Sequence, residues 1–317
     1  MKQFDLHFGA VCGVALFVGA VFGLGSCSGA EGVINSVEKE SGGCAPVRVH
    51  VSDFSFSVED YPGTRGGSQG TGSSGTRGAV DPSGYDYLKA ITLAFYAADG
   101  SEVSKTTQER GSGEGFGDFS LTLPLGSYTM VVIGRDVGND DVFSLTSAEE
   151  AGYTSERVRE TFCAMENVSI TSSAAVDLSV TLSRIVAQLS IQSTDGRPAG
   201  ASKIRTTYSA GGKMFSPSTG LAIEDAGFSV VNTPKTDVGV AIGVKNFAFL
   251  ASDEEVMDIR LEVLDDGDNV LITKVIEDVP LARNRKTTLS GALFTPTDVT
   301  MSVRVETDWL TDEMISF

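Results

Sequence analysis

Residues 24–27 carry the strongest chemical signal in the chain. They read Leu-Gly-Ser-Cys, and an aliphatic residue followed by two small residues and a cysteine is the pattern at which bacterial lipoprotein precursors are cut and acylated. Residues 8–25 contain no charged side chain and follow Lys2, as in a signal-peptide core. We therefore predict cleavage before Cys27 and transfer of a diacylglycerol to its sulfur. The alternatives are a membrane-anchoring helix, which the glycines of this stretch disfavour, and an ordinary secretory signal.

Two further cysteines, Cys44 and Cys163, remain once the signal peptide with its Cys12 is removed. An exported chain meets an oxidising compartment, in which a disulfide between them can form. Cys44 belongs to a glycine-rich tether over residues 27–46, whereas Cys163 lies in an expected strand. Two unconnected thiols are an equally good interpretation, so the sequence leaves both alternatives open.

Residues 63–83 form a Gly/Ser-rich segment without hydrophobic periodicity, which is typical of a flexible linker. The segment contains Gly-Thr-Arg-Gly twice, and these repeats supply Arg65 and Arg77. Basic side chains in an exposed linker are accessible to an arginine-specific, trypsin-like protease. The alternative is a solvated spacer in which both arginines are incidental.

The remaining composition argues against most enzymatic chemistry. A formal net charge of −18 disfavours nucleic acid as a partner. The signal peptide takes away His7, and His50 alone cannot supply a two-histidine metal site and does not suggest a Ser-His-Asp triad. The acidic residues 265–269 fit a hairpin turn better than a calcium loop, because the closing glutamate of an EF-hand is missing. We expect no catalytic site, no metal site and no cofactor.

The elements that must position these residues are almost all strands. Hydrophobic and polar residues alternate with a period of two in much of the chain, as in half-buried β-strands. In the segment 47–58 the alternation is interrupted at Asp53 and resumes in the opposite phase, which predicts a β-bulge or a switch between sheets. One short helix is expected over residues 146–160, with Ser147 as its N-cap. Further strands are expected at residues 91–95, 119–123, 128–132, 176–182, 187–191, 257–263, 270–276 and 299–309.

A change of phase at Arg184-Ile185 divides the chain. Apolar residues have even numbers from 176 to 182 and odd numbers from 187 to 191. An extended segment that changes its buried face midway passes from one core to another. We therefore predict an all-β chain with a signal peptide (1–26), a tether (27–46) and two β-sandwich domains, residues 47–184 and 185–317.

Several motifs, taken in order, resemble one known family. Each motif alone is a common strand or turn pattern, and their order is the more specific feature. Together they are similar to the FimB/Mfa2-type fimbrial subunits of Bacteroidetes, in the wider fimbrillin superfamily, over residues 47–317. The motifs are Cys27, Ile91-Thr-Leu-Ala-Phe-Tyr with Asp99-Gly100, Leu123-Pro-Leu-Gly-Ser-Tyr-Thr-Met-Val-Val, Leu182-Ser-Arg-Ile-Val-Ala-Gln-Leu, Arg283-Asn-Arg-Lys-Thr-Thr-Leu-Ser-Gly and Thr307-Asp-Trp.

The resemblance implies two transthyretin-like Greek-key β-sandwiches in tandem. It also implies a lipid-anchored protein of the cell outer membrane that enters or anchors a surface fimbria. Subunits of this kind assemble by strand complementation: a protease cuts after an arginine, and another subunit's strand replaces the first strand. Residues 47–58 would then be the first strand, Arg65 or Arg77 the cut, and residues 299–309 the donated strand. Anchor-type members keep their first strand, so the sequence leaves anchor, stalk and tip roles open.

The main alternative is a surface glycan-binding lipoprotein of a polysaccharide-utilisation system, which is also built from β-sandwiches. Such a protein needs a flat aromatic platform, and the chain has one tryptophan, Trp309, with seven tyrosines. A β-sandwich hydrolase is a third interpretation, but no convergent group of polar residues supports it. We therefore expect a structural protein without enzymatic activity.

Overall fold

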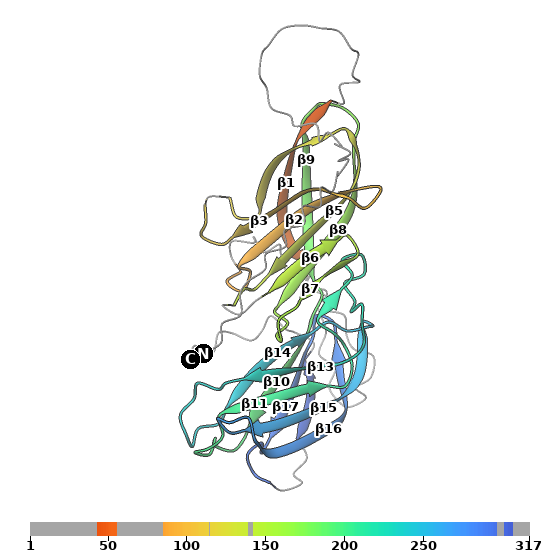
Figure 1. Cartoon of the computed structure of the whole chain (residues 1–317). Coiled ribbons are helices and arrows are strands. Elements are labelled where there is room, and N and C mark those ends of the chain that lie inside the picture. The colour runs from red at the N-terminus through yellow and green to blue at the C-terminus, as the bar shows by residue number, and fades with distance from the viewer. Residues whose placement is uncertain (1–42, 56–84, 114, 139–141, 297–300, 307–317) are drawn as a thin grey trace, which may run out of the picture. The chain divides into compact units, whose positions relative to one another are not determined.

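Strands make up all the regular structure that the computed structural model describes (Figure 1). The described residues are 43–55, 85–113, 115–138, 142–296 and 301–306. The predicted sites at Cys27, Arg65 and Arg77 lie outside these ranges, as do the linker 63–83 and Trp309. Within the described ranges the chain is all-β, as predicted, and it contains no helix long and apolar enough to cross a membrane.

Seven of the strands before residue 185 form one sheet, in the order β3-β2-β5-β8-β9-β1-β4. β8 and β9 pair at two positions only, Phe162 with Arg184 and Cys163 with Ser183, so the sheet divides there into two layers. The facing side chains of the two layers form one hydrophobic core. The strands of this half are β1 (Cys44–Ser55), β2 (Ala90–Ala97), β3 (Glu102–Glu109), β4 (Asp118–Pro124), β5 (Gly126–Arg135), β6 (Phe143–Ser147), β7 (Glu150–Tyr153), β8 (Thr161–Ile170) and β9 (Val176–Arg184).

The strands after residue 185 form two four-stranded sheets, β14-β10-β17-β18 and β13-β11-β15-β16. The inward side chains of both sheets make a second core, as in a β-sandwich. The strands are β10 (Ala187–Ser193), β11 (Lys203–Tyr208), β12 (Met214–Phe215), β13 (Phe228–Asn232), β14 (Gly243–Ala248), β15 (Glu254–Leu264), β16 (Val270–Ala282), β17 (Lys286–Gly291) and β18 (Ser302–Glu306).

A small fourth sheet, β12-β7-β6, joins strands from both halves of the chain. Phe215 of β12 and Phe249 pack against each other at a centroid distance of 4.5 Å, and Tyr153 of β7 stacks on Phe249 at 6.3 Å. These rings belong to a third hydrophobic cluster that also contains Tyr96 and Ile133. Residues 42–317 accordingly make one compact unit, and the division into domains 47–184 and 185–317 stays a prediction.

Three local predictions are confirmed. The register between β1 and β9 shifts between Val51 and Asp53, where the bulge was expected. Val180 and Leu182 face the first core whereas Leu189 faces the second, so the buried face does change near Arg184. Residues 265–269 form the β15–β16 hairpin turn, in which the Asp265 carboxylate accepts the Asn269 N–H at 2.8 Å.

The predicted helix over residues 146–160 is wrong. This segment contains the end of β6, the β6–β7 turn, β7 and the beginning of the chain that leads into β8. Ser147 does accept a hydrogen bond, from the Glu149 N–H at 3.1 Å, but it caps a turn and not a helix. Leu145, Ala151 and Tyr153 are buried in the third cluster, and this burial by distant residues outweighs the local capping signal.

Candidate strand-exchange interface

β1 occupies an interior position in its sheet although it is the first described strand (Figure 1). It pairs in parallel with β9 and antiparallel with β4, so both of its backbone edges are used. Its inward side chains Val47, Val49 and Val51 are at most 1% exposed. Full burial of a valine contributes about 1.5–3 kcal/mol. Removal of β1 would therefore leave an apolar slot between two strands with unpaired backbone groups.

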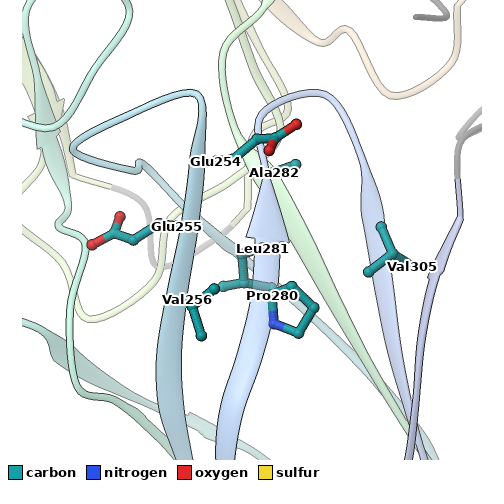
Figure 2. A pocket seen from close by; sticks show the side chains of 7 residues that line it. All are labelled: Glu254, Glu255, Val256, Pro280, Leu281, Ala282 and Val305. Atoms are coloured by element: carbon teal, nitrogen blue, oxygen red, sulfur yellow. The ribbon is translucent and has the colours of Figure 1, made fainter. Parts of the chain in front are cut away.

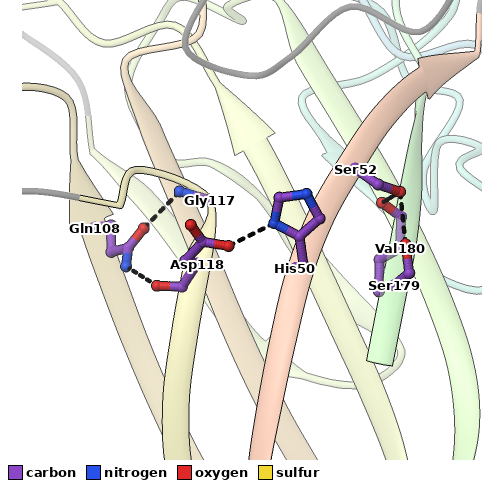
Figure 3. A network of polar contacts seen from close by, with 7 residues as sticks. All are labelled: His50, Ser52, Gln108, Gly117, Asp118, Ser179 and Val180. Carbon is purple, nitrogen blue, oxygen red and sulfur yellow. Dashed lines mark hydrogen bonds and ion pairs between the residues drawn. The ribbon is translucent and has the colours of Figure 1, made fainter. Parts of the chain in front are cut away.

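Polar side chains also connect the outer face of β1 to both of its neighbours (Figure 3). His50 projects toward β4, where its Nδ1 contacts Oδ1 of Asp118. Ser52 projects toward β9, where its Oγ accepts a hydrogen bond from Ser179 Oγ at 2.7 Å. Exposed polar contacts of this kind are weak. The buried valines and the backbone ladders are therefore the main hold on β1.

One side chain joins β3 and β4, the two edge strands of the seven-stranded sheet. Gln108 Nε2 donates to the carbonyl oxygen of Asp118 at 2.6 Å, and Gln108 Oε1 accepts from the Gly117 N–H at 2.9 Å (Figure 3). The side-chain amide of Gln108 thus presents one donor and one acceptor, as the backbone of a neighbouring strand would. Leu93 and Phe119 help to line a cavity of about 130 Å³ beside this contact. Gln108 therefore takes the place of a strand at the start of β4.

β18 is an edge strand with little side-chain cover. It pairs antiparallel with β17 at five positions and ends its sheet. Val303 lies opposite Leu289 and Val305 lies opposite Thr287, so these pairs share the core-facing side. Leu289 and Thr287 are fully buried, whereas Val303 is 39% exposed. The apolar side of β18 is thus poorly buried by its own sandwich.

A groove of about 220 Å³ lies beside β18 (Figure 2). Val305 forms one side of it, and the start of β15 and the end of β16 form the other. The groove leaves β18 supported mainly by β17 at this point. The residues on the opposite side are Glu254, Glu255, Val256, Pro280, Leu281 and Ala282.

The structure does not join Cys44 and Cys163 in a disulfide. Cys44 is the first residue of β1, and Cys163 is buried in β8 with its Sγ 3.7 Å from the carbonyl oxygen of Pro217. Burial raises the pKa of the Cys163 thiol to about 12. Because the thiolate is the reactive form, this thiol is protected from exchange in the folded chain. A Cys44–Cys163 bridge stays a prediction.

A buried polar cluster that no sequence motif indicated surrounds Arg184, at the end of β9. Its guanidinium contacts Glu160 Oε1 at 2.7 Å, Asn284 Oδ1 at 3.0 Å and the Tyr85 hydroxyl at 3.1 Å. The Tyr85 hydroxyl also donates to Glu160 at 2.8 Å. Burial raises the pKa of Glu160, and the attraction of Arg184 opposes that shift. Tyr85 lies shortly before β2, so the cluster fixes the approach to this strand through residues that lie outside β1.

For this cluster the sequence offered only the phase change at Arg184 and the family-like motif that contains Arg184, and neither indicated a buried ion pair. Glu160 and Tyr85 lie in no motif, and Asn284 lies in a turn segment whose pattern resembles a family without indicating a buried contact. The Gln108 contact left no signal at all, because glutamine is common on exposed strands. These residues were found only through their contacts.

A family model matches residues 52–316, which is most of the chain. The chain belongs to DUF6562, a family of unknown function. In this DUF6562 chain the matched range includes the end of β1 and all of β18, and it begins after the buried Val47, Val49 and Val51. No curated protein sequence matches it.

Solved structures similar to the DUF6562 chain include two fimbrial proteins of Porphyromonas gingivalis, the group that the sequence motifs resemble. The fimbrial anchor protein Mfa2 is 10% identical, with a TM-score of 0.47 over 83% of this chain and 97% of that chain. The tip fimbrial protein Mfa3, with a C-terminal truncation, is 12% identical, with a TM-score of 0.39 over 83% and 99%. A candidate polysaccharide-binding protein (DUF1812) from Bacteroides thetaiotaomicron is 8% identical, with a TM-score of 0.49 over 83% and 96%. Values of this size do not carry a function from those proteins to this chain.

Proposed function

We propose that this DUF6562 chain is a structural subunit of a bacterial surface fimbria. In this role the chain is exported as a lipoprotein, is acylated at Cys27 and reaches the outer membrane. It then joins other fimbrial subunits by β-strand exchange. The role needs no catalytic site, metal or cofactor.

The position of β1 is the observation that carries the proposal. β1 is an interior strand of its sheet, between β9 and β4, yet in the sequence its only covalent connection to β2 runs through residues 56–89. Both Gly-Thr-Arg-Gly repeats lie in that connection. A cut after Arg65 or Arg77 would therefore leave β1 attached by noncovalent contacts alone. An incoming strand with alternating apolar residues could then replace it through the same backbone ladders.

β18 supplies the complementary feature. Its apolar residues alternate with polar ones, and it lies at a sheet edge with its valines partly exposed. Because β18 buries little apolar surface in its own sandwich, its detachment costs little free energy. It would bury more apolar surface in a slot such as the one that β1 fills. In the proposal β18 and the residues after it form the donated strand.

The N-terminus of the protein extracted from the cell surface tests this proposal. N-terminal sequencing and intact mass should show either an acylated Cys27 or a chain that begins directly after Arg65 or Arg77. The first result fits an anchor role, and the second fits a subunit that is processed before entry into the fimbria. An uncut N-terminus in a soluble periplasmic protein would overturn the proposal.

No observation favours the glycan-binding alternative. Among the described residues Tyr87, which is 52% exposed, is the one aromatic side chain that is strongly exposed. A sugar-binding platform needs several coplanar aromatic rings at the surface.

A further inference from the structure

Glu306, the last residue of β18, lies against Lys286, the first residue of β17. Lys286 Nζ is 2.6 Å from Glu306 Oε2, and the two side chains are 5% and 23% exposed. Thr288 Oγ1 donates a longer hydrogen bond to the other carboxylate oxygen, at 3.4 Å. The carboxylate at the end of β18 is therefore bound by two side chains of β17.

The remainder of β18 offers few comparable contacts. Met301, which precedes the strand, is 5% exposed and packs over Gly291. A Cβ atom at Gly291 would lie 2.9 Å from Met301 Cγ, so the glycine is what admits this side chain. Between the two ends Val303 and Arg304 are exposed. β18 is thus held by its backbone hydrogen bonds to β17, by the packing of Met301 ahead of the strand and by the ion pair of Glu306 at its end.

The burial of Lys286 makes the ion pair important. A surface pair contributes little, whereas loss of a carboxylate from a buried lysine costs more, because the lysine is poorly solvated. Lys203 and Asp268 illustrate the weak case, because their side chains are 28% and 60% exposed at a similar distance of 2.7 Å. Departure of β18 takes the Glu306 carboxylate away from Lys286, and this loss opposes the departure.

We propose that the Lys286–Glu306 ion pair is a lock that keeps β18 on its own sheet. The lock sets how readily this strand is given to another copy or a related subunit. The inference rests on the proposed fimbrial function only where it says that β18 is donated to another subunit. The effect of the ion pair on β18 is a property of the monomer and can be measured in the monomer.

Hydrogen–deuterium exchange of the full-length monomer tests the lock. Glu306→Gln keeps the shape of the side chain and removes its charge. We expect those amides of residues 302–306 that are hydrogen-bonded to β17 to exchange at least about tenfold faster than in the wild type. Amides in β10 and β15 should be unchanged. Asp268→Asn, which breaks the exposed pair on Lys203, is the matched control and should leave β18 at the wild-type rate. Wild-type exchange of β18 in Glu306→Gln would overturn the lock.

A double-mutant cycle shows whether the effect belongs to the pair. Lys286→Met alone should also accelerate exchange of β18, because it leaves Glu306 without its cation. The double variant Lys286→Met, Glu306→Gln should exchange no faster than the faster single variant, since the interaction is already lost. Accelerations that multiply in the double variant would show two independent effects and overturn the lock.

The same variants separate the lock from the assembly. If strand exchange builds the fimbria, Glu306→Gln should form concentration-dependent oligomers faster than the wild type. Faster local exchange with unchanged oligomer formation would overturn the part of the inference that concerns donation. The complete absence of oligomers in every variant, including the processed wild type, would overturn the proposed assembly and leave the lock intact.

Discussion

Arg184 at the end of β9 and Glu160 ahead of β8 form an ion pair of 2.7 Å whose side chains are 0% and 6% exposed. The guanidinium also lies over the Phe162 ring, 5.0 Å from its centroid. Asn284 contacts the same guanidinium from the turn before β17. One buried cation therefore connects the first sandwich core, the segment after the linker and the C-terminal half.

We predict that Glu160→Gln lowers the free energy of unfolding by about 3 kcal/mol, because the variant removes a buried carboxylate from the Arg184 guanidinium. Urea denaturation measures this change. Asp177→Asn is the control, since the Arg48–Asp177 pair is 3.5 Å long and its side chains are 68% and 70% exposed. It should change stability by less than about 0.5 kcal/mol. Equal stabilities of Glu160→Gln and the wild type would contradict the prediction.

Val49→Ala should lower the free energy of unfolding by about 2 kcal/mol, because it removes two buried methyl groups from β1. Thermal or urea unfolding of the intact chain measures the loss. Val256→Ala makes the same chemical change at a side chain that is 60% exposed. That control should stay within about 0.5 kcal/mol of the wild type. If both variants lose the same amount, β1 is not part of the core.

Gln108→Ala should open the contact between β3 and β4. We expect a loss of about 1 kcal/mol, because two hydrogen bonds to the backbone of Gly117 and Asp118 disappear. Amide exchange at Gly117 should become faster, since its N–H then loses the Gln108 acceptor. Gln192→Ala, at an exposed position on β10, is the control and should leave Gly117 unaffected. If amide exchange at Gly117 is unchanged in Gln108→Ala, the Gln108 side chain does not replace the hydrogen bonds of a neighbouring strand.

The Cys163 thiol should make the protein less stable in alkali. Its pKa rises from 9.0 to about 12 in the folded chain because the thiolate is poorly solvated there. The unfolded chain therefore loses this proton first as the pH rises above 9.0, and the free energy of unfolding falls until the folded thiol ionises.

Cys163→Ala should remove that part of the pH dependence, as judged from urea denaturation between neutral and alkaline pH. In the wild type at neutral pH, alkylation of Cys163 should require unfolding. Rapid alkylation of Cys163 in the native protein would contradict its burial.

Local patterns predicted about half of the described strands and several of their details. Alternation of apolar and polar residues predicted the strands around Val49, Leu93 and Leu261, and an interrupted alternation predicted the bulge at Asp53. Such patterns are readable because the side chains of a strand alternate between two faces. β3 showed no such alternation because its residues Glu102–Glu109 are mostly polar on both faces. The helix predicted over residues 146–160 was wrong because it relied on a capping signal within the segment. The segment is instead fixed by burial against residues that are distant in the sequence.

The sequence by itself determined that this is an all-β chain whose buried face changes near Arg184, and it predicts an export signal and an arginine-containing linker. The tertiary structure alone decided that β1 lies between β9 and β4, and that Glu306 meets Lys286. Backbone hydrogen bonds are the same for every strand, so pairing depends on which distant strands bury their side chains together. A buried charge likewise needs a partner, and a partner brought from another strand leaves no pattern in the local sequence.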